Sequence, residues 1–138
     1  MSSKWTGCAG GGIVIFDTDV LIWVQRGNQK AARAINESED RYLSVWTYME
    51  LLQAAQNRQR HEYVAGFLRD LAFQTLPLTE RIGHRAAVYV AEYALSHGIR
   101  AADAIIAATA TENNLPLCSG NAKHYRAIQE LRLKVFRP

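Results

Sequence analysis

The fold is decided by the stretch Ile13-Val14-Ile15-Phe16-Asp17-Thr18-Asp19-Val20-Leu21-Ile22. Its first four residues form a continuous, largely β-branched apolar run that follows glycines, a pattern typical of a short buried strand. Apolar residues resume directly after the Asp-Thr-Asp triplet, and this predicts a helix over 20–25. The stretch therefore predicts a strand that is followed at once by a helix.

The same alternation of strand and helix continues along the rest of the chain. Apolar runs bounded by turn residues predict further strands at 42–45, 74–76, 115–118 and 133–136. Helical spacing predicts helices at 29–36, 46–57, 60–73, 80–96, 102–113 and 122–131, with Asn28 and Thr79 as N-caps and Gly98 as a C-terminal stop. We therefore expect a single α/β domain, a three-layer sandwich with a mainly parallel central sheet.

The chain has 138 residues, enough for one domain with a proper core. Residues 1–12, which end in Gly10-Gly11-Gly12, are expected to be a flexible leader, and residues 13–138 the folded domain. Hydrophobic residues make up 49% and charged residues 21%, an ordinary globular composition. The net charge of +3 is compatible with a polyanionic partner, although a surface excess of this size is often simply solvated.

The chain contains two cysteines, Cys8 and Cys118, which lie far apart and match no metal-ligand spacing. They are expected to be free thiols in a reducing compartment. No apolar run approaches the roughly 20 residues that a membrane-spanning helix needs. These features predict a soluble cytoplasmic protein without a membrane segment.

Three acids, Asp17, Glu50 and Asp103, each lie at the edge of a different apolar segment, and Ser119 and Asn121 follow the strand predicted at 115–118. Ligands of open α/β sheets bind beyond the carboxyl ends of the strands, where we expect these groups to meet. Like charges held that close repel one another unless a cation neutralises them. Oxygen ligands select a hard cation, so the pattern predicts a Mg²⁺ site, with Mn²⁺ as a substitute.

The expected chemistry of such a site is phosphodiester hydrolysis. Mg²⁺ keeps several waters and leaves room for phosphate oxygens, and it can activate a water and stabilise the charge that develops on the phosphate. No competing arrangement is present in the sequence. The four histidines are scattered, and the chain has neither a glycine-rich phosphate loop nor a zinc signature.

The order Asp17, Glu50, Asp103, Asn121, with apolar segments around the first and third, resembles the PIN-domain nucleases. Within that family the chain looks most like the VapC-type toxins of toxin–antitoxin pairs. The closing segment Ser119-Gly120-Asn121-Ala122-Lys123-His124-Tyr125-Arg126 also fits this group. The resemblance covers the chain from Ile13 onward.

The resemblance implies a Mg²⁺-dependent endoribonuclease with a PIN-like parallel-sheet fold, a homodimer, and inhibition by a small antitoxin that also supplies any binding to operator DNA. Asp17 and Asp103 would be the principal metal ligands. Glu50 would be a further ligand or the base for the attacking water, and Ser119 would bond metal-bound water or phosphate.

One position departs from many members of the family. They carry an acid where this chain has Asn121. An amide can still ligate a cation through its carbonyl oxygen, but it removes one negative charge. This departure favours a site with one metal ion.

Each of these residues also has a purely structural interpretation. Asp17 and Asp103 could cap the helices that follow them, and Arg100 is close enough in sequence to pair with Asp103. Glu50 could point to solvent. Ser119 and Asn121 are ordinary turn residues, and Asn121 could cap the last helix. The joint pattern favours a functional site, whereas no single residue does.

Two other functions remain as alternatives. Asp17-Thr18-Asp19-Val20 also resembles the first motif of haloacid-dehalogenase-type phosphatases, with Asp17 as nucleophile and Asp19 as acid/base, but that scheme needs a later acidic pair and only Glu130 follows Ser119. The second alternative is a weakly active binding module that works within a toxin–antitoxin operator complex.

Overall fold

The structure is a computed structural model, and it describes residues 5–7 and 12–138. Helices and strands alternate along the chain, as predicted. The elements are β1 (Trp5–Gly7), β2 (Ile13–Phe16), α1 (Thr18–Gln25), α2 (Gln29–Asn36), β3 (Asp40–Ser44), α3 (Val45–Ala54), α4 (Arg58–Asp70), β4 (Phe73–Leu76), α5 (Glu80–His97), α6 (Ala101–Glu112), β5 (Leu117–Ser119), α7 (Ala122–Tyr125) and β6 (Leu133–Val135).

The strands form one sheet in the order β1-β6-β5-β2-β3-β4, and each neighbouring pair is parallel. The prediction of a mainly parallel sheet is confirmed. Strand β1 was not predicted, because it lies in the segment expected to be a leader. It pairs with β6 from Trp5 opposite Leu133 to Gly7 opposite Val135. Apart from β1 and Gly12, that segment lies outside the described residues.

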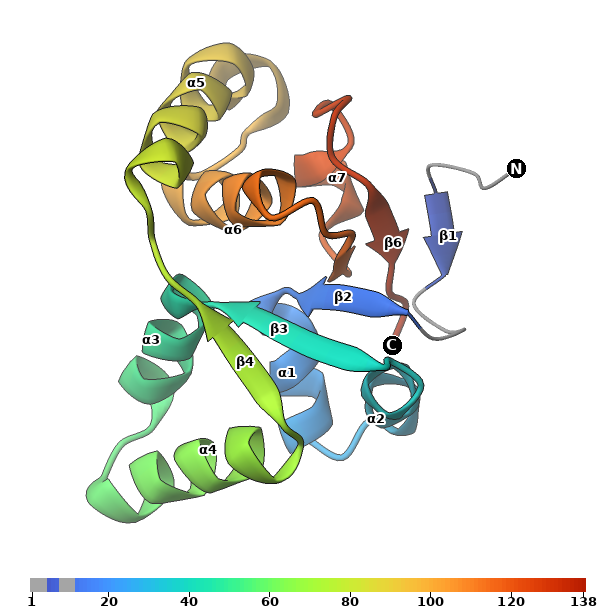
Figure 1. Ribbon diagram of the computed structural model, residues 1–138, viewed down its shortest axis with the longest axis vertical. Coiled ribbons are helices and arrows are strands. Elements are labelled where there is room, and N and C mark those ends of the chain that lie inside the picture. The colour runs from blue at the N-terminus through green and yellow to red at the C-terminus, as the bar shows by residue number, and fades with distance from the viewer. Residues whose placement is uncertain (1–4, 8–11) are drawn as a thin grey trace.

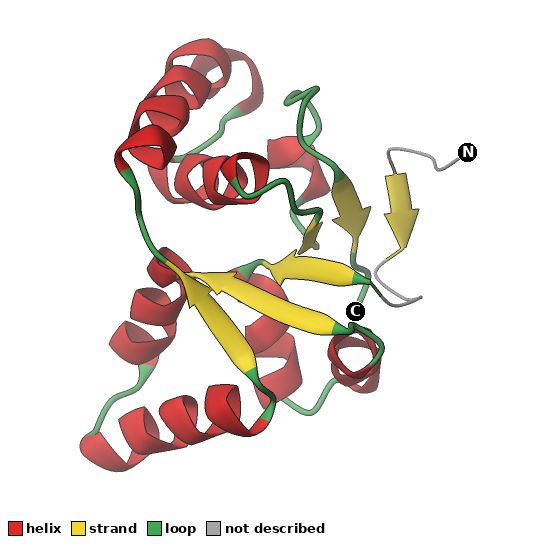
Figure 2. Ribbon diagram, in the orientation of Figure 1, coloured by secondary structure: helices red, strands yellow, loops and turns green. Residues whose placement is uncertain are grey.

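Helices cover both faces of the sheet, so the predicted three-layer α/β sandwich is confirmed. Figure 1 shows α1 to α4 on one face and α5 to α7 on the other, and in Figure 2 the yellow strands separate the two sets of red helices. The side chains of β2 explain this arrangement. Val14 and Phe16 belong to the core beneath α1–α4, while Ile15 belongs to the core beneath α5 and α6. Because successive strand residues face opposite sides, both faces of β2 must be covered.

The predicted helix signals are confirmed at three positions. Asn28 Oδ1 accepts a hydrogen bond from the Ala31 N–H at 2.9 Å, and Thr79 Oγ1 accepts one from the Ile82 N–H at 3.2 Å. Gly98 ends α5 in the left-handed conformation with φ of 68°, which a residue without a Cβ adopts at little cost.

The helix predicted at 122–131 is wrong in length, because α7 ends at Tyr125. Two tight turns follow, in which the Ile128 N–H bonds the Tyr125 carbonyl at 3.0 Å and the Leu131 N–H bonds the Ile128 carbonyl at 3.3 Å. These turns let Ile128 and Leu131 both enter the core, where each is 1% exposed. The apolar spacing that suggested a helix as far as Leu131 reflects this burial instead.

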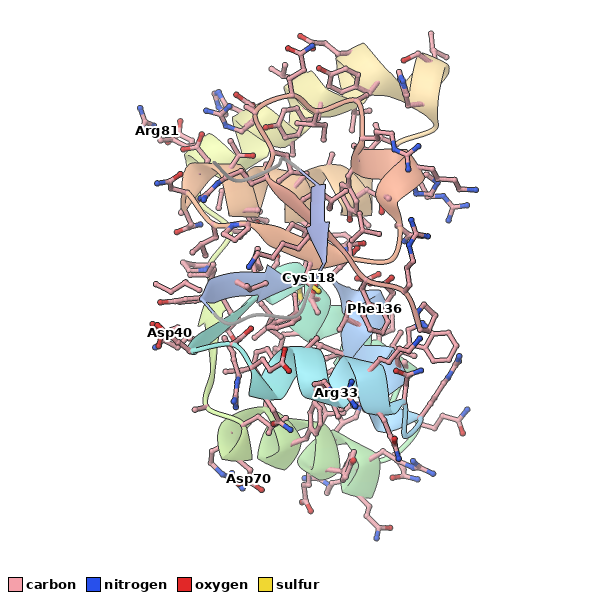
Figure 3. All side chains as sticks on the ribbon, turned by 90° about the vertical axis from the view of Figure 1, so that its right-hand side faces the viewer. Arg33, Asp40, Asp70, Arg81, Cys118 and Phe136 are labelled. Atoms are coloured by element: carbon pink, nitrogen blue, oxygen red, sulfur yellow. The ribbon has the colours of Figure 1, made fainter. Side chains whose placement is uncertain are left out.

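Cys118 lies on β5 in the middle of the molecule, as labelled in Figure 3, and is fully buried. It is disulfide-bonded. The expectation of a free thiol is therefore wrong for this residue, and Cys8 lies outside the described residues. The cysteines consequently no longer support the expectation of a reducing compartment.

Helix α5 is tied to its neighbours by Arg85, which bonds Glu112 of α6 and whose Nη1 lies 2.6 Å from Glu130 Oε1. Tyr89 donates from its hydroxyl to the same oxygen of Glu130. This network closes one side of the core above the sheet. Across residues 5–7 and 12–138, no helix combines the length and the apolar character needed to cross a bilayer.

The order of the strands reverses between β2 and β5, since the chain first builds outward through β3 and β4 and later returns to the other side of β2. Phe16 pairs with Cys118 in that ladder, so Asp17 and Ser119 lie side by side at the carboxyl ends of the two strands. Crevices at such reversal points are where α/β sheets bind ligands. The topology therefore places Asp17 and Ser119 at such a reversal point.

We expect the two isoleucines of β2 to contribute very differently to stability. Ile15 is fully buried, whereas Ile13 is 43% exposed. Ile15→Ala should lower the free energy of unfolding by about 2–5 kcal/mol because it leaves a cavity between sheet and helices. The matched Ile13→Ala should cost less than about 1 kcal/mol. Urea unfolding measures both, and equal losses would contradict the layer assignment.

Candidate functional site

Asp17 lies at the end of β2, where it is also the N-cap of α1, and it is only 4% exposed. Its carboxylate accepts three hydrogen bonds. The Thr18 N–H donates to Oδ1 at 2.8 Å, and the Ser119 hydroxyl (2.7 Å) and Tyr125 hydroxyl (3.0 Å) donate to Oδ2. A carboxylate offers about four acceptor positions. Three are occupied, so one position on Oδ1 is left for a further ligand.

Burial and, to a smaller extent, the neighbouring charge of Asp19 together raise the pKa of Asp17 to about 7, against the opposing effect of the three donors. At neutral pH the group is therefore divided between its acid and its anion. Desolvation and a like charge both disfavour the charged form, and a cation at the site would reverse both effects. A bound cation would therefore stabilise the charged form of Asp17.

Glu50 is half-buried on α3 and does not simply point to solvent. Its Oε1 lies 2.7 Å from Thr18 Oγ1, which lies in turn 2.9 Å from the hydroxyl of the fully buried Thr47. These contacts link α3 to the first residue of α1. Glu50 is therefore hydrogen-bonded to Thr18, the residue that directly follows Asp17.

Asp103 is the third residue of α6, and its side chain is 14% exposed. Its Oδ2 accepts a hydrogen bond from the Arg100 N–H at 3.1 Å, so the capping interpretation is confirmed. The imidazole of His124 faces this oxygen, with its Nδ1 3.3 Å away, and the two would form an ion pair when the imidazole is protonated. The charge of Asp103 raises the pKa of Asp19 and of Tyr125, so the three side chains share one region.

Asp19 was not assigned to this site from the sequence, where it featured only in the phosphatase alternative. It lies in the first turn of α1. Its Oδ2 accepts a hydrogen bond from the Gly120 N–H at 2.9 Å, and its Oδ1 is buried without a hydrogen-bond partner in the described structure. Burial is the main reason that the pKa of Asp19 is raised.

Ser119 is the last residue of β5, and Asn121 follows that strand at the same edge of the sheet. Ser119 is fully buried, and its hydroxyl donates to Asp17 and accepts from the Asn121 N–H at 2.9 Å. In this arrangement Ser119 positions the Asp17 carboxylate, and its predicted contact with water or phosphate stays a prediction. Asn121 occupies the N-cap position of α7 without a side-chain capping bond, so its amide is not committed to that role.

Tyr125 was missed altogether by the sequence reasoning. It is 1% exposed on α7, and its hydroxyl donates to Asp17 Oδ2. Burial and the charge of Asp17 raise its pKa well above the usual range, so it remains a donor at physiological pH. The sequence did carry a signal for this role, a tyrosine four residues after Asn121. If that tyrosine is buried, its hydroxyl needs a hydrogen-bond partner, and a nearby carboxylate can provide one.

The donor set fits a hydrated hard cation. Within the described ranges, no three His, Cys, Asp or Glu side chains are arranged as a ready-made metal site. Mg²⁺, however, commonly takes only one or two carboxylates and keeps several waters. The vacant acceptor position on Asp17 Oδ1 and the unpartnered Asp19 Oδ1 are the kind of oxygen atoms that such an ion or its waters bind.

The phosphatase alternative loses its remaining acid. Glu130 is the only acidic residue after Ser119, and it is bonded to Arg85 and Tyr89 beneath α5. It therefore serves the packing of that helix. No acidic pair is left to hold a cation behind the serine.

The model of the PIN domain family matches residues 14–130 of the chain. That match spans the acids at 17, 50 and 103 and the residues that follow β5. No curated protein matches the chain in sequence. The family match rests on most of the chain rather than on one motif.

Solved structures with the same fold include toxin–antitoxin complexes. A chain of a toxin–antitoxin complex from Klebsiella pneumoniae is 25% identical with a TM-score of 0.73, covering 86% of this chain and 94% of that one. FitAcB from Neisseria gonorrhoeae is 26% identical with a TM-score of 0.68, covering 91% and 98%. VapBC2 from Rickettsia felis, bound to a DNA fragment from their promoter, shares the fold at 16% identity with a TM-score of 0.74, covering 91% and 99%.

The resemblance noted in the sequence to the PIN-domain nucleases is thus confirmed by the family model, and the fold is shared with chains of toxin–antitoxin complexes. The buried acid at the end of β2, the strand reversal beside it and the match over residues 14–130 lead to one conclusion. The chain belongs to the PIN-domain family.

Proposed function

We propose that this protein is a Mg²⁺-dependent endoribonuclease, the toxin of a toxin–antitoxin pair, which hydrolyses RNA phosphodiester bonds in the cytoplasm. Membership in the PIN-domain family supports a hydrolase that acts on nucleic acids. The observation that carries the proposal is the buried Asp17 carboxylate, with its pKa near 7, at the reversal point of the sheet. Such perturbed acids in a ligand-binding position are typical of catalytic sites.

In this proposal Asp17 and Asp103 bind the cation, and Asn121 adds its amide oxygen. A bound Mg²⁺ supplies Lewis acidity for the phosphate and a more acidic water as nucleophile. Ser119 and Tyr125 hold the Asp17 carboxylate in a fixed orientation through its Oδ2, which leaves Oδ1 for the ion. The neutral amide at Asn121 favours a single ion, and Mn²⁺ would substitute for it.

Glu50 is the proposed base for the attacking water. Its Oε1 is fixed by the Thr18 hydroxyl, and this contact orients the carboxylate while leaving its other oxygen for a proton. Thr18 follows Asp17 directly, so the base and the metal ligand are joined by one peptide unit. A role for Glu50 as a further metal ligand is compatible with the same geometry.

The proposed partner is a small antitoxin that covers the toxin and carries the complex to operator DNA. The complexes from Klebsiella and Rickettsia support a partner of this class. An apolar groove of about 480 Å³ offers a docking surface between α1, α2 and α4. Its lining includes Val24, Ile35, Tyr63, Phe67 and Leu71, and Tyr63 is 54% exposed.

A homodimer is also proposed. On the outer face of α5, Val88 and Leu95 lie one heptad apart and are both exposed, Leu95 fully. An apolar stripe of this kind on a long helix suits a second copy of the chain. The alternative of a weakly active binding module would keep both interfaces and lack cleavage, so the activity assay below separates the two functions.

Asp17→Asn should abolish RNA cleavage. The purified protein with Mg²⁺ should cut structured RNA, and the variant should be slower by roughly a hundredfold or more because it loses a charged ligand. Excess EDTA should stop the wild-type reaction, and Mn²⁺ should restore it. Asp70→Asn is the control for cleavage, since the Asp70 side chain is 78% exposed at the end of α4, which carries none of the proposed catalytic residues. Cleavage by folded Asp17→Asn, or full activity in EDTA, would contradict the proposal.

The stability of the metal-free protein should depend on pH through Asp17. Its pKa in the folded state is about 7, above the ordinary 3.8, so between these values the folded protein holds a proton that the unfolded chain has lost. Stability should therefore fall as pH rises from about 4 to about 7, by up to about 4 kcal/mol. Asp17→Asn removes this dependence.

Urea unfolding of both proteins across this range measures the effect. The stability gained by Asp17→Asn should be largest above pH 7 and vanish near pH 4. Saturating Mg²⁺ at pH 8 should stabilise the wild type and leave the variant unchanged. Parallel curves for the two proteins would show that Asp17 does not titrate as its burial requires.

The product of a short reading frame beside the gene should co-purify with this protein. Tyr63→Asp places a charge in the apolar groove and should prevent capture of that partner. Leu78→Asp is the matched control, since Leu78 is similarly exposed at 48% but lies outside the groove. Equal capture by both variants would exclude the groove as the docking surface.

A further inference from the structure

One carboxylate at the site has no complete explanation in the packing. Asp19 Oδ1 is buried and has no hydrogen-bond partner among the described residues, while Oδ2 accepts from Gly120. The N–H groups of Asp19 itself and of Val20 lie near enough to lower its pKa, but neither makes a hydrogen bond of normal geometry to Oδ1. A buried carboxylate oxygen without a partner is costly, and each such atom calls for a missing ligand.

The position of this carboxylate depends on the absence of a side chain at Gly120. A Cβ at that residue would lie 2.6 Å from Asp19 Oδ2 and 3.4 Å from the Phe136 carbonyl oxygen. The backbone of Gly120 is not left-handed, so conformation does not require glycine there. Space requires it. The loop after β5 is thus shaped to receive the carboxylate of Asp19, 101 positions earlier in the chain.

The charges around Asp19 indicate what its unpartnered oxygen would bind. Asp19 lies two residues after Asp17, in the first turn of α1. Its Oδ2 accepts from the Gly120 N–H, while Asp17 accepts from the hydroxyl of Ser119, so the two acids contact consecutive residues at the end of β5. Asn121 adds no charge, and the cation of the proposed function needs negative charge to be held.

We propose that Asp19 supplies the third negative charge of the divalent-cation site, beside Asp17 and Asp103, and that Gly120 is the residue that admits it. This inference rests on the proposed metal-dependent function. Asn121 provides no negative charge to the site. In this inference the missing charge comes instead from Asp19, in the first turn of α1 directly after β2. Asp19 acts on the ion or on its bound water, and Gly120 positions it.

The test is the binding of Mn²⁺ to metal-free protein, measured by isothermal titration calorimetry without RNA. Asp19→Asn should weaken binding by about tenfold or more, because it removes a full charge and keeps an oxygen that accepts from Gly120. Asn121→Ala, which removes only a neutral group, should weaken binding far less. Circular dichroism and thermal unfolding of each variant confirm that it is folded.

Gly120→Ala provides a second variant that leaves all acids in place. Its methyl group displaces the Asp19 carboxylate, so it should weaken Mn²⁺ binding about as much as Asp19→Asn. Combined with Asp19→Asn, it should add little further loss, because both changes act on the same group. This cycle keeps the test decisive if one variant is poorly folded.

The results for the wild type and the variants distinguish a failure of the role of Asp19 from a failure of the proposed metal-dependent function. If the wild type binds no Mn²⁺, the proposed metal-dependent function fails and the inference with it. If the wild type binds Mn²⁺ and Asp17→Asn does not, the metal site stands. In that case, unchanged Mn²⁺ binding by Asp19→Asn would overturn the role of Asp19 alone. So would a loss of Mn²⁺ affinity in Asn121→Ala as large as the loss in Asp19→Asn.

Discussion

The burial of one carboxylate, that of Asp17, is the constraint on which the site depends. Removing an acid from water costs several kcal/mol unless hydrogen bonds or a cation compensate. Thr18, Ser119 and Tyr125 each donate to it, yet the pKa of Asp17 is still raised to about 7. The donors fix the orientation of the group without making its charge stable. In the proposed function, a bound divalent cation supplies the remaining stabilisation of that charge.

The topology provides this environment. Because β2 and β5 are neighbours, the Ser119 hydroxyl reaches across 102 positions of the chain to Asp17, and the short helix α7 brings the Tyr125 hydroxyl from 108 positions away. Helices on both faces of the sheet exclude water from the same junction. The fold and the chemistry are therefore coupled at one point, where a strand ends and the order of the sheet reverses.

Features that depend on local signals could be predicted from the sequence. The strand at Ile13–Phe16 and the caps at Asn28 and Thr79 follow from short-range patterns, and Asp17 follows from its place after the strand. Strand β1, the disulfide of Cys118 and the short α7 could not be predicted in this way, because each depends on distant partners. Tyr125, and Asp19 against Gly120, were missed for the same reason, since their contacts join the two ends of the chain.

The central claim is that groups from distant segments meet around one divalent ion. Crystals of the protein soaked in Mn²⁺ and measured near the manganese absorption edge test it most directly. The account predicts one anomalous peak in contact with Asp17 Oδ1, with Asp103 in the same coordination sphere and Asp19 beside it. An anomalous map with no peak at the end of β2, or with manganese bound only by groups elsewhere, would contradict it.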